Sequence, residues 1–255
     1  MCARSNWWRS STGFSRSPAG SPAGSGELTR LPNIVLIYAD DLGYGDLGCF
    51  GSNSIKTPHL DGLAEGGQRF TNWYSNSPVC SPSRAGLLTG RYPGNAGVRS
   101  ILSGHRTATG LPSCVPTIAT ALKDIGYQTA MFGKLHFGNN RKGFDQFKIL
   151  PGKGNYYNPD FIKNKDTTRI EGYATDIITE MGLDWLKNNR EKEKPFMLMV
   201  QHKAPHRNWM PALRHINKYD SIEFPLPESY FSDHKGQVAA QEQLQTIYKD
   251  MYEGH

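Results

Sequence analysis

Two uninterrupted apolar runs place the tightest limits on how this chain can fold. Residues 33–39 read NIVLIYA, and residues 196–200 read FMLMV. Runs of this length without polar alternation are typical of strands that are buried on both faces of a parallel sheet. A third strand is expected at 127–132, directly after a glycine, and a further short strand at 69–74. Because parallel strands need crossover connections, helices are expected between them.

Helical patterns lie between and after these strands. The expected helices cover residues 58–65, 81–89, 116–125, 172–190 and 237–252. The second is expected to begin with Ser81 as its N-cap and Pro82 as its first helical residue. The fourth carries one apolar stripe, formed by Ala174, Ile177, Ile178, Met181 and Trp185. This order predicts an α/β fold with a mostly parallel sheet flanked by helices on both faces.

The composition is that of a folded protein. Of the 255 residues, 37% are hydrophobic and 20% are charged, which is enough for one substantial core. No run approaches the roughly 20 apolar residues of a spanning helix, so no membrane span is expected. The net charge of +6 favours anionic partners. The Lys and Arg residues are dispersed, however, so a nucleic-acid partner is not expected.

Residues 1–31 differ from the rest of the chain. The stretch 10–26 consists mostly of Ser, Gly, Pro and Ala with interspersed Arg. Such a segment buries too little apolar surface to offset the entropy of ordering it. We therefore expect a flexible leader at 1–31 and a folded domain at 32–255. The leader contains no continuous apolar stretch of the kind found in secretory signals.

Polar residues follow each of the three apolar strands. Asp40 and Asp41 follow the first strand, Lys134 and His136 the second, and His202 and His206 the third. In doubly wound α/β sheets, ligands bind beyond the carboxyl ends of the strands. Three such clusters in one chain predict a single site at that edge of the sheet.

Each cluster also has a purely structural interpretation. Asp40 and Asp41 can form a turn, but adjacent carboxylates at such an edge favour a hard cation such as Ca²⁺ or Mg²⁺, with further oxygen ligands from elsewhere. Lys134 and His136 are spaced i, i+2, so on a strand they share a face and can hold an anion and protonate a leaving oxygen. The alternative is a solvated strand end. His206 lies in a proline-containing loop, where an isolated histidine is more often a surface residue.

Cys80 lies near the expected start of the second helix, four residues before Arg84. A lone cysteine is usually a small buried hydrophobe. At a helix N-terminus it faces free N–H groups and a partial positive charge, which bind oxyanions. A cysteine-dependent phosphatase would need an arginine at position 86. That position is Gly, which excludes this chemistry.

Three segments resemble the type I sulfatase family. Residues 80–91 (CSPSRAGLLTGR) resemble its signature, in which Cys-x-Pro-Ser-Arg is followed by a Leu-Thr-Gly-Arg end. Residues 32–46 resemble the opening strand with its metal-binding aspartates. Residues 133–136 resemble the Gly-Lys-Trp-His element, with Leu135 in place of the usual aromatic. The resemblance runs from about Pro32 to the end and implies an alkaline-phosphatase-like sulfatase domain.

The resemblance implies that Cys80 is oxidised after translation to formylglycine by a formylglycine-generating enzyme, which reads the Cys-x-Pro-Ser-Arg core. The hydrated aldehyde carries two hydroxyls on one carbon. One hydroxyl attacks sulfur and expels the alcohol, and the other then loses its proton, so that the sulfate ester collapses to the aldehyde and releases sulfate. The sulfate ester of an ordinary serine would be stable, because it has no second hydroxyl on the same carbon, and the reaction would stop there.

The resemblance also implies a role for each matching residue. Asp40 and Asp41, together with the modified Cys80, are expected to bind calcium. The expected catalytic residues are Arg84, which supports the hydrate, Lys134 and His206, which hold the sulfate and assist the leaving oxygen, and His136, which orients the hydrate or takes its proton. These groups would stabilise a sulfuryl group that gains equatorial charge.

The chain departs from the family in one respect. Family members are normally about twice as long, and their second pair of metal ligands is an Asp-Asn dipeptide, which does not occur in these 255 residues. We therefore expect the chain to be the N-terminal part of a sulfatase, or a truncated product that has lost catalysis. A related phosphatase or phosphonate monoester hydrolase remains a further alternative.

The expected substrate is a sulfated small molecule or glycan. Residues 154–159 (GNYYNP) and Trp209 offer amides and aromatic faces suited to sugar rings, although ordinary loop packing accounts for them equally well. These features resemble those of sulfatases that act on sulfated glycans, particularly N-acetylhexosamine 6-sulfates. The family is typically periplasmic, secreted or lysosomal.

Overall fold

The structure, a computed structural model, describes residues 31–102, 110–137, 142–226 and 228–242. Almost all of the predicted leader at 1–31 and most of the helix predicted at 237–252 lie outside the described residues. The chain divides into two compact units. One contains residues up to 38 together with 75–202, and the other contains 39–74 together with 203–255.

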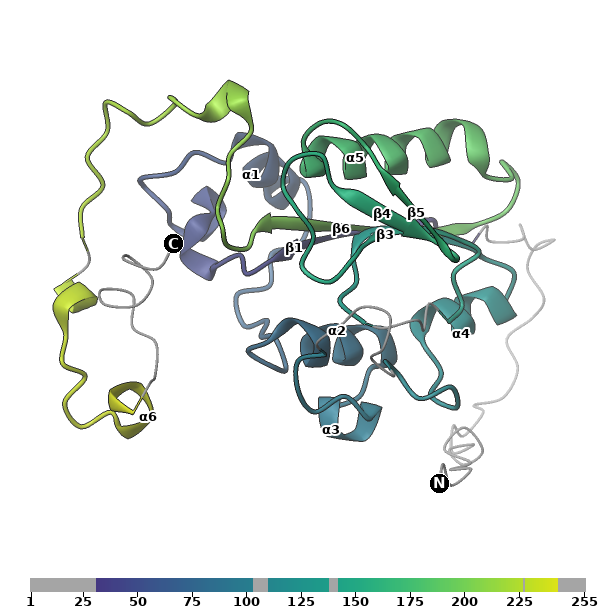
Figure 1. Cartoon of the computed structure of the whole chain (residues 1–255), viewed down its shortest axis with the longest axis horizontal. Helices are drawn as coiled ribbons and strands as arrows, with labels where there is room; N and C mark the ends of the chain where they lie inside the picture. The colour runs from purple at the N-terminus through teal and green to yellow at the C-terminus, as the bar shows by residue number, and fades with distance from the viewer. Residues whose placement is uncertain (1–30, 103–109, 138–141, 227, 243–255) are drawn as a thin grey trace, which may run out of the picture. The chain divides into compact units, whose positions relative to one another are not determined.

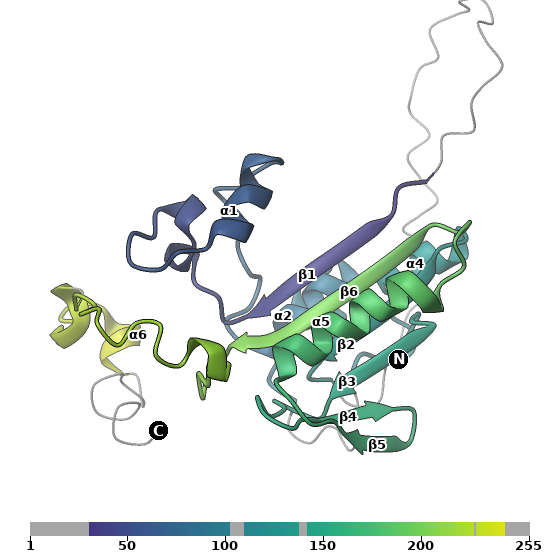
Figure 2. The ribbon, with the colours of Figure 1, turned by 90° about the horizontal axis from the view of Figure 1, so that it is seen from above.

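Six strands form one mostly parallel sheet. They are β1 (Ile34–Asp40), β2 (Gln128–Lys134), β3 (Gln146–Leu150), β4 (Asp160–Lys163), β5 (Asp166–Arg169) and β6 (Phe196–Pro205). Their order is β1-β6-β2-β3-β4-β5, as Figure 2 shows from above. β2 pairs in parallel with β6 and β3, whereas β4 pairs antiparallel with β3 and β5. The predicted strands at 127–132 and 196–200 are confirmed, and both extend further than predicted.

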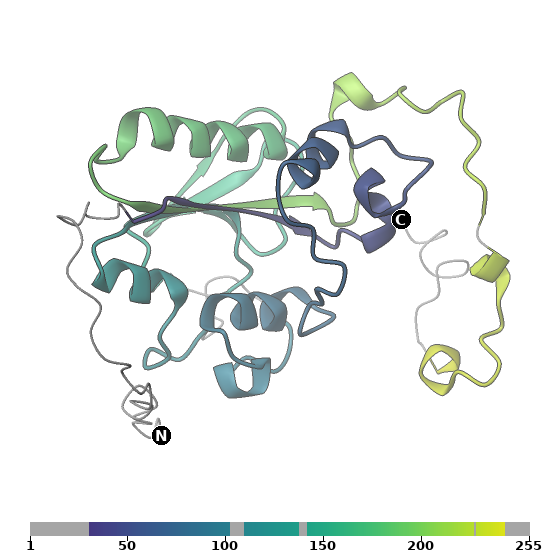
Figure 3. The same ribbon diagram turned by 180° about the vertical axis from the view of Figure 1, so that it is seen from behind.

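The described residues also form helices. They are α1 (Pro58–Glu65), α2 (Cys80–Thr89), α3 (Pro93–Ala96), α4 (Ile118–Asp124), α5 (Ala174–Asp184) and α6 (Val238–Gln241), with a π-helical turn at Trp185–Asn189 and 3₁₀ turns at Tyr44–Asp46, Gly48–Phe50, Leu213–His215 and Glu228–Phe231. Within the first unit, α5 lies on one face and α2 and α4 lie on the other (Figures 1 and 3). The predicted α/β architecture is confirmed. None of the helices in the described ranges is long and apolar enough to cross a membrane.

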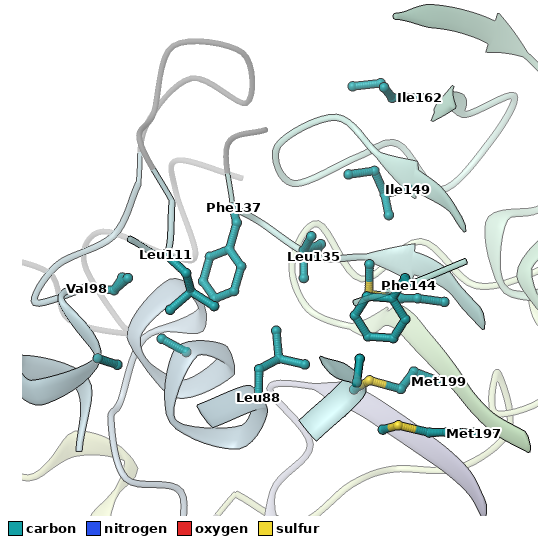
Figure 4. Packing of buried hydrophobic residues seen from close by; sticks show 14 of the residues in the cluster. Leu88, Val98, Leu111, Leu135, Phe137, Phe144, Ile149, Ile162, Met197 and Met199 are labelled. Carbon is teal, nitrogen blue, oxygen red and sulfur yellow. The ribbon is translucent and has the colours of Figure 1, made fainter. Parts of the chain in front are cut away.

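The core of the first unit has two layers, one on each face of the central strands. Met131, Met197 and Met199 join the cluster that contains Leu88 of α2 (Figure 4). The intervening residues of β2 and β6 join a second cluster with Ile178 of α5. Successive strand residues point to opposite faces, so both faces of β2 and β6 are buried. For β6, the apolar run FMLMV predicted this burial.

β1 does not follow that prediction. Val35 is 49% exposed and Ile37 is 60% exposed, although the run NIVLIYA predicted burial on both faces. β1 ends the strand order, whereas the buried cluster around α5 is built on β2 and β6. An edge strand has a neighbour on one side only, and no helix of the first unit's described residues covers this pair of side chains.

The strand predicted at 69–74 is absent. This described segment contains a turn at residues 71–72 and no strand. The rings of Phe70 and Trp73 lie 5.4 Å apart on either side of the turn, although both remain exposed. A high content of aromatic residues favours strands, but here these residues pack on each other across a turn.

Asp145 connects β2, β3 and α4 and gives the fold a dependence on pH. Its carboxylate accepts bonds from the Thr129 N–H at 3.0 Å and the Thr129 hydroxyl at 3.1 Å, and it also pairs with Lys123. Burial by itself raises the pKa of this carboxyl, but the bonds from Lys123 and Thr129 outweigh burial and hold the pKa below its ordinary value of 3.8.

We expect Asp145→Asn to lower the free energy of unfolding near neutral pH. A depressed folded-state pKa stabilises the fold above the unfolded-state value, and this stabilisation is lost as pH falls through the folded-state pKa. The difference between wild type and variant should therefore shrink in acid, as measured by urea unfolding at several pH values. Asp166→Asn, at an exposed carboxylate in β5, is the matched control. A difference that stayed constant with pH would contradict the assignment.

Candidate active site

The first turn of α2 is buried deeply in the first unit. Every residue from Cys80 to Gly86 is buried. A side chain at Gly86 would overlap the amide of Asn76, so this glycine allows the helix to lie against that loop. The helix ends at Gly90, whose φ of 64° is left-handed, as is common for a glycine after a helix. The sequence from Cys80 to Gly90 thus sets a helix whose N-terminus points into the protein.

Cys80 and His136 lie side by side. The Cys80 Sγ is 2.8 Å from the His136 Nδ1, and His136 is only 8% exposed. β2 ends at Lys134 and the φ of His136 is 55°, so the prediction that Lys134 and His136 share a strand face is wrong. The left-handed backbone beyond the strand end directs this imidazole to the start of α2.

Ser81 contacts the backbone of the same histidine. Its hydroxyl donates to the His136 carbonyl at 2.8 Å and accepts from the Leu102 N–H at 3.1 Å. The prediction that Ser81 is the N-cap of the helix is wrong. The N-cap is Val79, which makes no side-chain cap. Ser81 faces inward because the helix begins two residues earlier than the serine–proline pair indicated.

Arg84 joins α2 to three neighbouring strands. Its guanidinium donates to the Lys134 carbonyl and the Gln201 side-chain oxygen, and it lies 4.9 Å from the centre of the Tyr38 ring. These partners belong to β2, β6 and β1, which are adjacent in the sheet. Arg84 is 1% exposed and Lys134 is fully buried. Sequence reasoning missed Gln201, although a glutamine directly after the apolar run FMLMV was a signal.

Asp40, Asp41 and His206 belong to the second unit. Asp40 is the last residue of β1 and is buried, whereas Asp41 has a left-handed φ of 64° and an exposed side chain. The Asp41 Oδ2 lies 3.7 Å from the His206 Nε2. The other ring nitrogen of His206 contacts the Arg207 carbonyl. The structure thus brings Asp41 and His206 together, as the prediction of neighbouring strand ends requires.

The remaining residues that the sequence pointed to differ in how deeply they are buried. Tyr156 is buried, and its ring stacks on Tyr173 at 6.0 Å, so it packs within the protein. Trp209 is 54% exposed with a left-handed φ of 46°. His202 lies within β6, and burial lowers its pKa. Its Nδ1 makes no hydrogen bond to the described part of the chain.

No complete metal site is present among the described residues. Within those ranges, no group of three or more His, Cys, Asp or Glu side chains is arranged to hold an ion. The adjacent carboxylates of Asp40 and Asp41 form part of such a donor set at most.

These features can be compared with known proteins. The sequence model of the family described as Sulfatase matches residues 32–253. The chain belongs to the sulfatase family. It is 41% identical over 225 residues to the N-acetylglucosamine-6-O-sulfatase of Bacteroides thetaiotaomicron, covering 87% of this chain and 39% of that relative. It is 51% identical over 116 residues to arylsulfatase A of Homo sapiens, covering 46% of this chain and 23% of that relative.

Solved structures show the same fold. A protein in complex with its substrate D-glucosamine-2-N,6-O-disulfate matches with a TM-score of 0.80 and 40% identity, covering 86% of this chain and 44% of that chain. A crystal structure with k-i-k-neocarrahexaose matches with a TM-score of 0.71 and 29% identity, covering 76% of this chain and 49% of that chain. This sulfatase chain therefore spans less than half the length of these relatives.

Proposed function

We propose that this chain is the N-terminal part of a sulfuric ester hydrolase that removes sulfate from sulfated carbohydrates or aryl sulfates. The observation that carries the proposal is the contact between Cys80 and His136. Within the sulfatase signature, the Cys80 Sγ lies 2.8 Å from the His136 Nδ1, at the buried N-terminus of a ten-residue helix. A nucleophile and a base within hydrogen-bond reach are the minimum that covalent catalysis requires.

We propose that Cys80 is converted to formylglycine by a formylglycine-generating enzyme. The aldehyde, once hydrated, supplies a nucleophilic hydroxyl and a second hydroxyl that allows the sulfate ester to collapse. His136 is placed to hold or accept a proton at that residue. Arg84 supports the site because its guanidinium fixes α2 against the end of β2 and the middle of β6.

We propose that Lys134 and His206 bind the sulfate group and assist the leaving oxygen, and that the exposed Trp209 contacts the substrate. Lys134 ends β2 and is fully buried, where a cation attracts an oxyanion strongly because the dielectric constant is low. His206 is 7% exposed. The carbohydrate substrate class follows from similarity to a named N-acetylglucosamine-6-O-sulfatase and to a structure with a disulfated glucosamine.

We propose that Asp40 and Asp41 bind Ca²⁺, with Mg²⁺ as the alternative, together with the modified Cys80. The donor chemistry fits, since carboxylate oxygens are the ligands these cations prefer. When bound, the cation would polarise oxygen atoms of the substrate or nucleophile. Calcium takes 6–8 oxygen ligands, so two aspartates form part of its shell, and the remaining ligands are expected from other segments.

Metal removal tests this assignment. We expect a chelator to abolish sulfate-ester turnover by the active protein and added Ca²⁺ to restore it. Asp41→Ala should weaken Ca²⁺ binding by at least the roughly 10–100-fold that loss of an outer-shell partner causes, as measured by calorimetric titration. Asp220→Ala, at an exposed carboxylate of the same unit, is the control. Unchanged Ca²⁺ affinity in Asp41→Ala would remove Asp41 from the site.

The function itself is tested by comparing initial rates on an aryl sulfate and the matching aryl phosphate. We expect faster sulfate hydrolysis. Faster phosphate hydrolysis would indicate a related phosphatase or phosphonate monoester hydrolase. Absence of turnover on either ester, in protein whose Cys80 is converted, would indicate a non-catalytic sulfatase-like protein and overturn the proposal.

A further inference from the structure

We propose that Ser81 is a positioning residue, whose hydroxyl holds the backbone of His136 so that the imidazole meets the reactive group at position 80. This inference rests on the proposed function, because it assigns His136 a part in catalysis through Cys80. It concerns the variable position of the Cys-x-Pro-Ser-Arg core, which Ser81 occupies.

The direction of both Ser81 hydrogen bonds is fixed by the chemistry of their partners. A carbonyl oxygen can only accept and an N–H can only donate. The hydroxyl hydrogen therefore points to the His136 carbonyl at 2.8 Å, and a lone pair accepts from the Leu102 N–H at 3.1 Å. Because Ser81 is fully buried, water cannot replace either bond. The hydroxyl is thus a fixed bridge between two segments.

His136 needs such a support. Its φ of 55° is left-handed, a conformation that is unfavourable for a residue with a Cβ. Leu135 and Phe137, which are buried in the core on either side (Figure 4), fix the path of the chain. They do not fix the rotation of the peptide plane that carries the His136 carbonyl. The bond from Ser81 does, because it restrains the carbonyl of His136 itself.

Two adjacent residues of α2 therefore contact the same histidine. Cys80 contacts its side chain and Ser81 contacts its backbone. The backbone contact sets where the side chain begins, and the side-chain contact sets the direction of the imidazole toward position 80. Without the hydroxyl, the His136 carbonyl and the Leu102 N–H both lose this partner, and the restraint that Ser81 places on the His136 backbone is removed. Misplacement of a catalytic group by about 1 Å can cost 10²-fold in rate.

Ser81→Ala tests the proposal in the full, active protein. Conversion of Cys80 is first checked by peptide mass, since the substitution leaves the other residues of the recognition core intact. We expect kcat for aryl sulfate to fall by about 10- to 100-fold with KM little changed. The control is Thr179→Val, which removes an exposed hydroxyl that bonds within its own helix α5, to the Thr175 carbonyl. This control should keep wild-type kcat.

A double-mutant cycle with His136→Ala separates positioning from general loss of stability. In the His136→Ala background, Ser81→Ala should cause little further loss of kcat, because the group that it positions is gone. An equal loss in both backgrounds would overturn the proposal.

Two measurements do not depend on turnover. In Ser81→Ala, the Leu102 amide should exchange with deuterium at least about tenfold faster, and a crystal structure should show the His136 imidazole displaced from residue 80. An imidazole that stays in place would overturn the positioning role. If the wild-type protein fails to hydrolyse sulfate esters while these two results hold, the proposed function is wrong, but Ser81 still positions His136.

Discussion

Cys80→Ala is expected to lower kcat/KM for sulfate-ester hydrolysis by at least about three orders of magnitude, because it removes the nucleophile of covalent catalysis. Alanine carries neither a thiol nor a group that can be oxidised to an aldehyde. The buried start of α2 and the contacts of Ser81 and Arg84 remain available to the variant. The loss should therefore appear in turnover, with the melting temperature little changed.

The measurement combines turnover with the mass of the peptide that contains residue 80. In the active wild-type protein, this peptide should have lost sulfur and two hydrogens and gained oxygen, the change from thiol to aldehyde. Cys49→Ala is the matched control, since Cys49 is a second free cysteine that has no part in the proposed chemistry. Full turnover by Cys80→Ala, or an unmodified thiol in highly active protein, would refute the assignment of Cys80.

Gly133→Ala is expected to lower the free energy of unfolding by about 2–5 kcal/mol, the sum of left-handed strain and overpacking. The φ of Gly133 is 107°, and a Cβ there would overlap the carbonyl oxygen of Gln201 and lie 3.2 Å from the Ile178 Cδ1. The clash involves backbone of the neighbouring strand β6, which cannot move without breaking the β2–β6 pairing. Since whole domains are stable by only about 5–15 kcal/mol, this loss is a large fraction of the total stability.

Urea unfolding of the purified variant measures this effect. Gly126→Ala is a close control, because Gly126 has a similar φ of 95° but nothing within 4 Å of the position of a Cβ. It should lose only the strain of about 1–2 kcal/mol. Equal losses in the two variants would show that the close approach of Gly133 to β6 has no energetic effect.

Much of the fold was predictable from local pattern. The run FMLMV identified β6, and the stripe that contains Ile177 and Ile178 identified α5 and its buried face. Each of these signals lies within one segment, where side-chain periodicity reports burial directly. The exposure of Val35 and Ile37 was not predictable, because it depends on the place of β1 in the strand order.

The candidate site was likewise predictable from the sequence only in part. The sequence determined which residues we propose for the chemistry: the signature around Cys80, the aspartate pair after β1 and the histidines after β2 and β6 are all visible in the linear order. Only the tertiary structure decided how they are held. Ser81 bonds to a residue 55 positions away, and Arg84 bonds to one 117 positions away. Local propensity carries no information about such pairs, because they form only when α2 packs beneath adjacent strands.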